Sequence, residues 1–224
     1  MIEQRSKHMA YEKFFNEIYA ITALKYFWRG YVKGFVKWES PDWYHEKAGI
    51  GIEVSQALLP KDGQEENFIE TYLGKHRAEI PEEAALRYKN RLYFYNDRLW
   101  ALLDDGTSSV PCEEKILVRF KSKLAKLNAN YLPCETNALY LFAHAEPNEK
   151  TVSRLRKQMA EIQRSEARRF DLIFLDCNST LYILDFRQNE TETIPIPEKA
   201  RLFLNEEAET LRRSFTNESG APYE

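Results

Sequence analysis

The sequence of 224 residues is poor in glycine, and this scarcity argues against two large classes of nucleotide-binding protein. It contains 8 glycines, and neither G-x-G-x-x-G nor G-x-x-x-x-G-K followed by Ser or Thr occurs anywhere. These patterns form the phosphate loops of dinucleotide-binding and P-loop proteins, whose backbones need glycine to approach a phosphate closely. We therefore expect neither a Rossmann nor a P-loop nucleotide site.

Cysteines and long apolar runs are also scarce. Cys112, Cys134 and Cys177 lie far apart, and no C-x-x-C or closely spaced histidine pair occurs, so a structural zinc site is not expected. Cysteines distributed in this way are typical of a reducing compartment. No apolar run reaches the roughly 18 residues of a membrane span, and the N-terminus lacks the apolar segment of a signal peptide. The sequence predicts a cytoplasmic protein without a membrane partner.

Positive charge is not in excess, whereas aromatic residues are plentiful. The net charge of −3 is not typical of a protein that coats nucleic acid, but a nuclease needs positive charge only near its groove. The 13 Tyr, 13 Phe and 4 Trp residues indicate a substantial hydrophobic core. Length and core together favour a single domain over residues 1–224.

The spacing of apolar residues predicts a fold of the α/β (α+β) class. Three short strands in quick succession predict an antiparallel meander, because parallel neighbours need a longer crossover. The expected helices cover residues 9–28, 66–77, 81–91, 113–129 and 149–168, followed by a short helix and a frayed polar end after Pro197. The expected strands cover residues 31–38, 40–44, 49–56, 92–95, 99–103, 138–144, 171–175 and 181–186.

Two carboxylates stand out within the meander. Asp42 follows Pro41 at a short extended run, and Glu53 lies inside the apolar strand Ile50–Ser55. An acidic residue inside an apolar strand is costly unless it has a partner, and a divalent cation is a common one. Two neighbouring strands that present Asp42 and Glu53 would form an oxygen site suited to Mg²⁺ (or Mn²⁺), which points to phosphodiester chemistry.

The order helix, three-strand meander, helix, strand resembles the core of the PD-(D/E)XK, or restriction-endonuclease-like, nuclease superfamily. Pro41-Asp42 matches the "PD" element and Glu53-Val54-Ser55 the "(D/E)XK" element. The resemblance implies a restriction-endonuclease-like core over residues 1–145, with a mixed central sheet flanked by helices. Residues 146–224 would then add a helix and a strand hairpin to the same domain.

The resemblance also implies roles for individual residues. Asp42 and Glu53 would hold Mg²⁺ or Mn²⁺ together with the Val54 carbonyl. The family's first helix often adds a carboxylate, for which Glu12 and Glu17 are both candidates. The implied substrate is nucleic acid, with DNA favoured over RNA.

One position departs from the family pattern, because Ser55 stands where the family has its lysine. A replacement cation is expected from the helix over 113–129, whose apolar stripe spans an arc of about 80°. Lys123 lies about 20° outside that stripe, whereas Arg119 and Lys121 lie further round. Gln56 is a further candidate, although a regular strand turns it to the opposite face and only a β-bulge would redirect it.

The predicted contacts to nucleic acid are basic residues on two helices. The helix over 149–168 carries four of them on one face, interrupted by Glu161, and the helix over 113–129 carries one more. Such a face tracks a phosphate backbone or is simply solvated. The residues are Lys121, Arg154, Lys157, Arg164 and Arg168.

Three functions remain open on the sequence alone. The first is a metal-dependent nuclease, with a homodimer as one open assembly state. The second is a nuclease-fold protein with a degenerate site that works as a binding or regulatory module. The third is an unrelated α/β interaction protein. Geometry distinguishes them: converging carboxylates with a nearby lysine favour the first, converging carboxylates without one favour the second, and diverging carboxylates favour the third.

Overall fold

A computed structural model gives the architecture. It describes residues 2–57, 64–65, 68, 71–72, 74–89, 91–95, 97–102, 111–143, 147–177 and 179–219, and the side chains of most of these. A seven-stranded sheet has the order β1-β2-β3-β6-β7-β8-β9. Its strands are β1 (Val36–Lys37), β2 (Trp43–His45), β3 (Ile50–Gln56), β6 (Thr136–Phe142), β7 (Leu172–Asp176), β8 (Thr180–Asp185) and β9 (Glu190–Pro195).

The sheet is mixed, and its connections follow from the chain lengths between strands. β1, β2 and β3 form an antiparallel meander, as the sequence predicts. β3, β6 and β7 run parallel, and each parallel step is made by a crossover that contains a helix. β8 and β9 return antiparallel through short turns.

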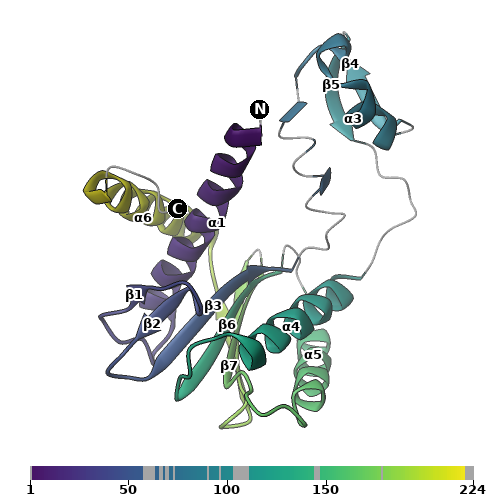
Figure 1. Cartoon of the computed structure of the whole chain (residues 1–224). Coiled ribbons are helices and arrows are strands. Elements are labelled where there is room, and N and C mark those ends of the chain that lie inside the picture. The colour runs from purple at the N-terminus through teal and green to yellow at the C-terminus, as the bar shows by residue number, and fades with distance from the viewer. Residues whose placement is uncertain are drawn as a thin grey trace.

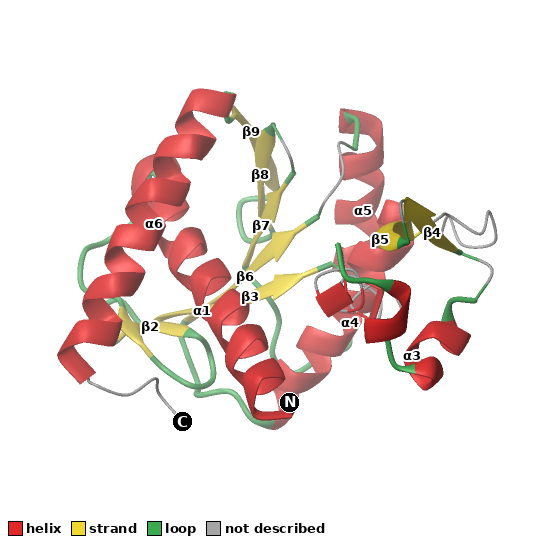
Figure 2. Cartoon of the chain, turned by 90° about the horizontal axis from the view of Figure 1, so that it is seen from above, coloured by secondary structure: helices red, strands yellow, loops and turns green. Residues whose placement is uncertain are grey.

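Helices cover both faces of the sheet. α1 (Ile2–Phe27) and α6 (Glu198–Ser219) lie on one face, and α4 (Cys112–Ala129) and α5 (Glu149–Ile162) on the other (Figures 1 and 2). Alternate residues of β6 therefore enter different cores: Tyr140 packs with α1, and Leu141 packs with α4 and α5. Burial on both faces explains the nearly continuous apolar runs of β6 and β7.

A buried polar cluster ties α6 to the sheet, and we call it the Asp176 cluster. The Arg201 guanidinium donates to Asp176 Oδ1 at 2.9 Å and to the Tyr19 hydroxyl at 2.9 Å. The Tyr140 hydroxyl donates to Asp176 Oδ2 at 2.5 Å. Burial and the Asp176 charge hold the pKa of Tyr140 far above its ordinary value, so this hydroxyl remains a donor.

A small lobe is inserted between β3 and α4. It contains α3 (Glu82–Arg87) and the hairpin of β4 (Leu92–Tyr95) and β5 (Arg98–Leu102), and Figure 1 shows it beyond the end of the central sheet. A hydrophobic cluster of its own includes Phe68, Tyr88 and Leu99.

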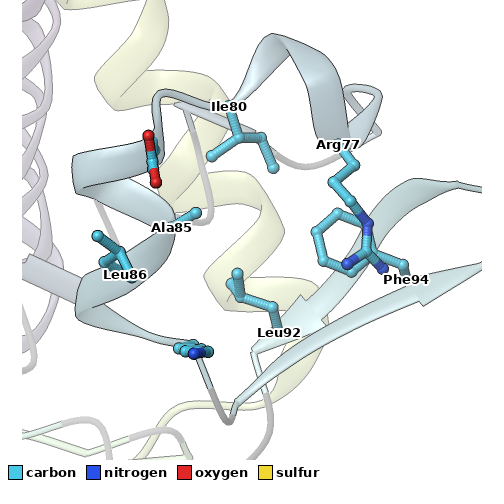
Figure 3. Close-up of a pocket in the computed structure, with 8 residues that line it drawn as sticks. Arg77, Ile80, Ala85, Leu86, Leu92 and Phe94 are labelled. Carbon is cyan, nitrogen blue, oxygen red and sulfur yellow. The ribbon is translucent and has the colours of Figure 1, made fainter.

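The lobe carries a hollow of about 220 Å³. Figure 3 shows the Arg77 side chain against the Phe94 ring, with the guanidinium carbon 3.9 Å from the ring centroid. None of the residues predicted to form the site lines this hollow. Its lining residues are Arg77, Ile80, Glu82, Ala85, Leu86, Lys89, Leu92 and Phe94.

Most expected elements are confirmed, but several bounds differ and one strand is new. The strand expected over 31–38 is only Val36–Lys37, and the helix expected from residue 9 begins at Ile2. The helix expected over 149–168 ends at Ile162, where the backbone N–H of Gln163 caps it and the Gln163 side chain exchanges hydrogen bonds with the Phe170 backbone. β9 was not expected, because its residues are mostly exposed and lack an apolar alternation. α6 is 22 residues long, rather than short, and buries Leu204 and Ala208 against the sheet.

Two further points concern boundaries and membranes. Of the helix expected over 66–77, residues 68, 71 and 72 are helical, residues 74–76 are not, and residues 66, 67, 69, 70 and 73 lie outside the described residues. The hairpin of β4 and β5 is confirmed. Within the described ranges, no helix combines the length and apolar character needed to cross a bilayer. The single domain over 1–224 stays a prediction.

Candidate active site

Asp42 lies beside the middle of β3 because a glycine lets the preceding proline pack there. A Cβ atom on Gly51 would lie 2.7 Å from Pro41 Cγ and 2.6 Å from Cys134 Sγ, so no larger residue fits without displacing them. Asp42 Oδ2 accepts a hydrogen bond of 2.8 Å from the Val54 N–H. The "PD" element is thereby fixed against the strand that carries Glu53.

The edge of β3 near Asp42 presents a backbone carbonyl as well. β2 pairs with β3 only as far as Ile52, so the following residues of β3 have no β2 partner on that side. The N–H and C=O of one strand residue point to the same side. Because the Val54 N–H points to Asp42, the Val54 carbonyl faces the same edge.

Glu53 points from β3 toward α4. Its register partner on β6, Leu139, packs in the core that α4 and α5 cover. There the Lys123 ammonium donates a hydrogen bond to Glu53 Oε1. Glu53 is 6% exposed and Lys123 9%, so the two charges meet inside the protein.

A second lysine joins two more carboxylates. Lys37 Nζ lies 2.9 Å from Glu17 Oε2 and 3.7 Å from Asp42 Oδ1. It also donates to the backbone carbonyls of Trp38 and Asp42 at 3.1 Å each. Glu17 is held in place by a hydrogen bond of 2.8 Å from the Trp43 indole to its own carbonyl.

We call these five residues the Asp42–Glu53 cluster. Among the described residues it contains three carboxylates and two ammonium groups, and all three acids are at most 6% exposed. Its members are Glu17, Lys37, Asp42, Glu53 and Lys123.

Electrostatics in the cluster raise the pKa values of two of its acids, Asp42 and Glu53. Burial raises the pKa of Asp42 to about 6, helped by the nearby Glu17 charge, although Lys37 and the Val54 N–H act in the opposite direction. Burial and the Asp42 charge also raise the pKa of Glu53, against the lowering effect of Lys123. The Asp42 charge thus acts on Glu53, and Asp42 also accepts a hydrogen bond from Val54, the residue next to Glu53.

The segment after α4 places Tyr131 next to Glu53. Burial and then the Glu53 charge raise the pKa of Tyr131, and its hydroxyl lies next to Glu53 without a hydrogen bond of good geometry to a described residue. Arg168 holds this segment by donating to the carbonyls of Leu127, Tyr131 and Leu132 at 2.7–2.8 Å. The Arg168 guanidinium is therefore directed into the protein.

The other basic residues predicted to contact nucleic acid do not form one helical face. Arg164 and Arg168 lie beyond the end of α5, which corrects the expected helix. The Arg154 guanidinium makes a bidentate pair with Glu113, and Arg164 pairs with Glu161 at 2.6 Å. Lys121 and Lys157 are exposed. Their contact with nucleic acid stays a prediction.

Two further candidates are placed differently from the site. β3 pairs with β6 in unbroken register through Gln56 and Phe142, so no bulge turns Gln56 toward Glu53. Phe142 packs on the α1 side, and Gln56 therefore lies on the face opposite Glu53. This corrects the expectation that Gln56 could replace the lysine missing at Ser55. Glu12 belongs to α1, but its side chain lies outside the described residues, whereas Glu17 joins the cluster.

The donor set suits a hard cation only in part. Within the described ranges, no group of three or more His, Cys, Asp and Glu side chains is arranged to hold a metal ion. Asp42, Glu53 and the Val54 carbonyl supply three oxygens, and Mg²⁺ commonly completes its shell with water and substrate phosphate. Buried acids whose pKa values are raised, as those of Asp42 and Glu53 are, are the kind of group that a divalent cation stabilises.

Sequence reasoning did not find Lys37. Its role depends on the pairing of Lys37 with Trp43 across β1 and β2, which turns both side chains toward α1. The signal in the sequence was a lysine that alternates with Val36 and Trp38 in a strand whose partner carries Asp42.

Comparisons with known proteins supply no independent assignment. No family model matches the chain. No curated protein is significantly similar to it, and no solved structure matches its fold.

Proposed function

We propose that this protein is a divergent metal-dependent nuclease with a restriction-endonuclease-like core, which hydrolyses phosphodiester bonds in DNA in the cytoplasm. The observation that carries the proposal is the buried ion pair of Glu53 with Lys123 from α4, next to Val54, whose N–H binds Asp42. A lysine from this helix is what the Ser55 departure requires. The order α1, β1–β2–β3, α4, β6, with β6 parallel to β3, is consistent with that superfamily.

The residues of the cluster divide the work of hydrolysis. Asp42, Glu53 and the Val54 carbonyl would hold Mg²⁺ or Mn²⁺, and Lys37 keeps Glu17 and Asp42 together. A bound divalent cation supplies Lewis acidity and lowers the pKa of a coordinated water. Lys123 provides positive charge for the phosphate, where negative charge develops during attack. The surrounding apolar core excludes bulk water and strengthens these interactions.

A second candidate is a degenerate nuclease fold that only binds. Lys123 neutralises Glu53, and Lys37 contacts both Glu17 and Asp42, so the acids already have counter-charges in the metal-free protein. A binding module would keep these ion pairs permanently. The two candidates therefore differ in whether metal enters the cluster.

The deciding experiment combines metal titration and cleavage. We expect isothermal titration of Mn²⁺ to show binding by wild type and none by Glu53→Gln. Asp42→Ala should reduce metal-dependent cleavage of single- and double-stranded DNA by at least about 10³-fold, because it removes a metal ligand. Glu39→Ala, an exposed acid in the same loop, should cleave as wild type does.

Two outcomes contradict the nuclease. If Asp42→Ala still cleaves DNA as wild type does, the nuclease activity does not depend on the Asp42–Glu53 cluster. Metal binding that Glu53→Gln leaves intact would remove the cluster from consideration. Nucleic-acid binding by wild type without cleavage or metal binding would favour the binding module. Parallel substrates of RNA test the preference for DNA.

A further inference from the structure

The Lys123 ammonium occupies a carboxylate oxygen that a metal ion at the proposed site would use. It donates to Glu53 Oε1, and both side chains are buried. Lys123 enters the site from the α4 face that buries Phe120, Leu124 and Leu127. In the metal-free protein, Lys123 is therefore the counter-cation of Glu53.

A lysine and a divalent cation cannot both stay against the same oxygen. Their mutual repulsion at hydrogen-bond distance is large inside a protein, where neither bulk water nor salt screens it effectively. Metal entry must displace one of the ammonium groups of the cluster.

The two lysines are not equally anchored. Lys37 contacts Glu17, the Asp42 carboxylate and two backbone carbonyls. Among the described residues, Lys123 makes its hydrogen bond to Glu53 alone. A lysine ammonium on a flexible four-carbon stem relocates easily when one contact is lost, so Lys123 is the group that moves.

We propose that Lys123 and a divalent cation exchange at Glu53. The lysine keeps the metal-free site closed, and metal binding releases its ammonium, which remains tethered to α4 within reach of the substrate phosphate. This exchange rests on the proposed nuclease function and adds to it an order of events. Metal entry comes first, and it creates the cation that meets the phosphate.

Metal titration of lysine variants in the absence of nucleic acid tests the exchange. Lys123→Met should bind Mn²⁺ about tenfold to a hundredfold more tightly than wild type, because the metal no longer breaks a charged hydrogen bond. Lys123→Arg keeps the competing charge and should show no such gain. Lys126→Met, an exposed lysine one turn along α4, should match wild type.

The possible results separate the exchange from the function on which it rests. Equal Mn²⁺ affinity of wild type and Lys123→Met overturns the exchange and leaves the nuclease standing. Binding by neither protein overturns both proposals. A gain with Lys123→Met but not with Lys123→Arg supports the exchange.

A measurement on wild type guards against a variant that does not fold. Acetylation of lysines, located by mass spectrometry, should increase at Lys123 by at least about twofold when saturating Mg²⁺ is added, because its ammonium leaves a buried ion pair. Lys126 should be acetylated equally with and without Mg²⁺. Unchanged acetylation of Lys123 in metal-saturated protein overturns the exchange.

Discussion

Two buried clusters of this protein combine carboxylates with cationic side chains but differ in how well the carboxylates are satisfied. In the Asp176 cluster, one carboxylate receives hydrogen bonds from the Arg201 guanidinium and the Tyr140 hydroxyl, which occupy both of its oxygens. In the Asp42–Glu53 cluster, three carboxylates face two ammonium groups among the described residues, and the pKa values of Asp42 and Glu53 are raised. The first arrangement joins α6 to the sheet. The second holds buried carboxylates close together at a cost in folding free energy.

The difference indicates which of the two clusters would gain free energy by binding a ligand. Acids that are kept close together at a cost in stability are common at functional sites, because a ligand can relieve the repulsion. A carboxylate that is fully hydrogen-bonded within the protein offers no such gain. We therefore expect disruption of the Asp176 cluster to destabilise the protein, and neutralisation of the Asp42–Glu53 cluster to stabilise it.

The largest effect is expected from Arg201→Met. The substitution leaves the Asp176 charge buried without its guanidinium, and breaking a buried pair in this way costs about 3–5 kcal/mol of unfolding free energy. Urea denaturation measures the loss. Arg213→Met removes an exposed arginine of the same helix, and its cost should be less than about 0.5 kcal/mol. Similar losses from both variants would contradict the difference between the clusters.

An intermediate effect of opposite sign is expected from Asp42→Asn. Because the pKa of Asp42 is about 6 when folded and about 4 when unfolded, the folded protein binds more protons between these values. Unfolding free energy should therefore fall as pH rises from about 4 to about 6. The full penalty, on the order of 2–3 kcal/mol, applies above pH 6.

Asp42→Asn removes this penalty, and its amide oxygen can still accept the Val54 N–H. In metal-free buffer the variant should be more stable than wild type at pH 7.5, with a smaller loss between pH 4.5 and 7.5. Part of the loss should persist, since Glu53 shifts in the same direction. Chemical denaturation at both pH values measures it, and a wild-type stability that rises over this range would contradict the raised pKa.

The smallest effect separates two tyrosines. Tyr140→Phe deletes a hydroxyl that donates to a buried carboxylate, so we expect a cost of about 1–3 kcal/mol. Tyr131→Phe deletes a buried hydroxyl that lies next to Glu53 without a hydrogen bond of good geometry to a described residue, and its cost should be less than about 1 kcal/mol. Thermal unfolding compares the pair, and equal losses would show that Tyr131 is bonded as firmly as Tyr140.

The sequence predicted the elements that alternate clearly and the residues that they place together. The stripe on α4 indicated that Lys123 could reach a site on β3, and the structure places its ammonium on Glu53. Glu53 was found because an acid inside an apolar strand needs a partner, and Asp42 because it follows Pro41 at a neighbouring extended run. Whether these residues catalyse a reaction stays a prediction.

Features that depend on long-range pairing could not be predicted from the sequence. Lys37 reaches Glu17 and Asp42 only because of the register between β1 and β2. Arg168 continues the basic spacing of α5, but the cap at Gln163 ends the helix before it. β9 has a polar sequence and owes its place to hydrogen bonds with β8. Local pattern specifies none of these contacts.

The inserted lobe has a consequence for the order of folding. Glu53 and Lys123 are 70 positions apart in the chain, and the lobe with its own hydrophobic cluster lies between them. Contacts of such long sequence separation form late, because the intervening chain must first be closed into a loop. Closure becomes only slightly harder as a loop grows, by about 0.6 kcal/mol for each doubling in length. Because the lobe has a hydrophobic cluster of its own, it can form from local contacts. Glu53 and Lys123 then meet only when β3 and α4 dock.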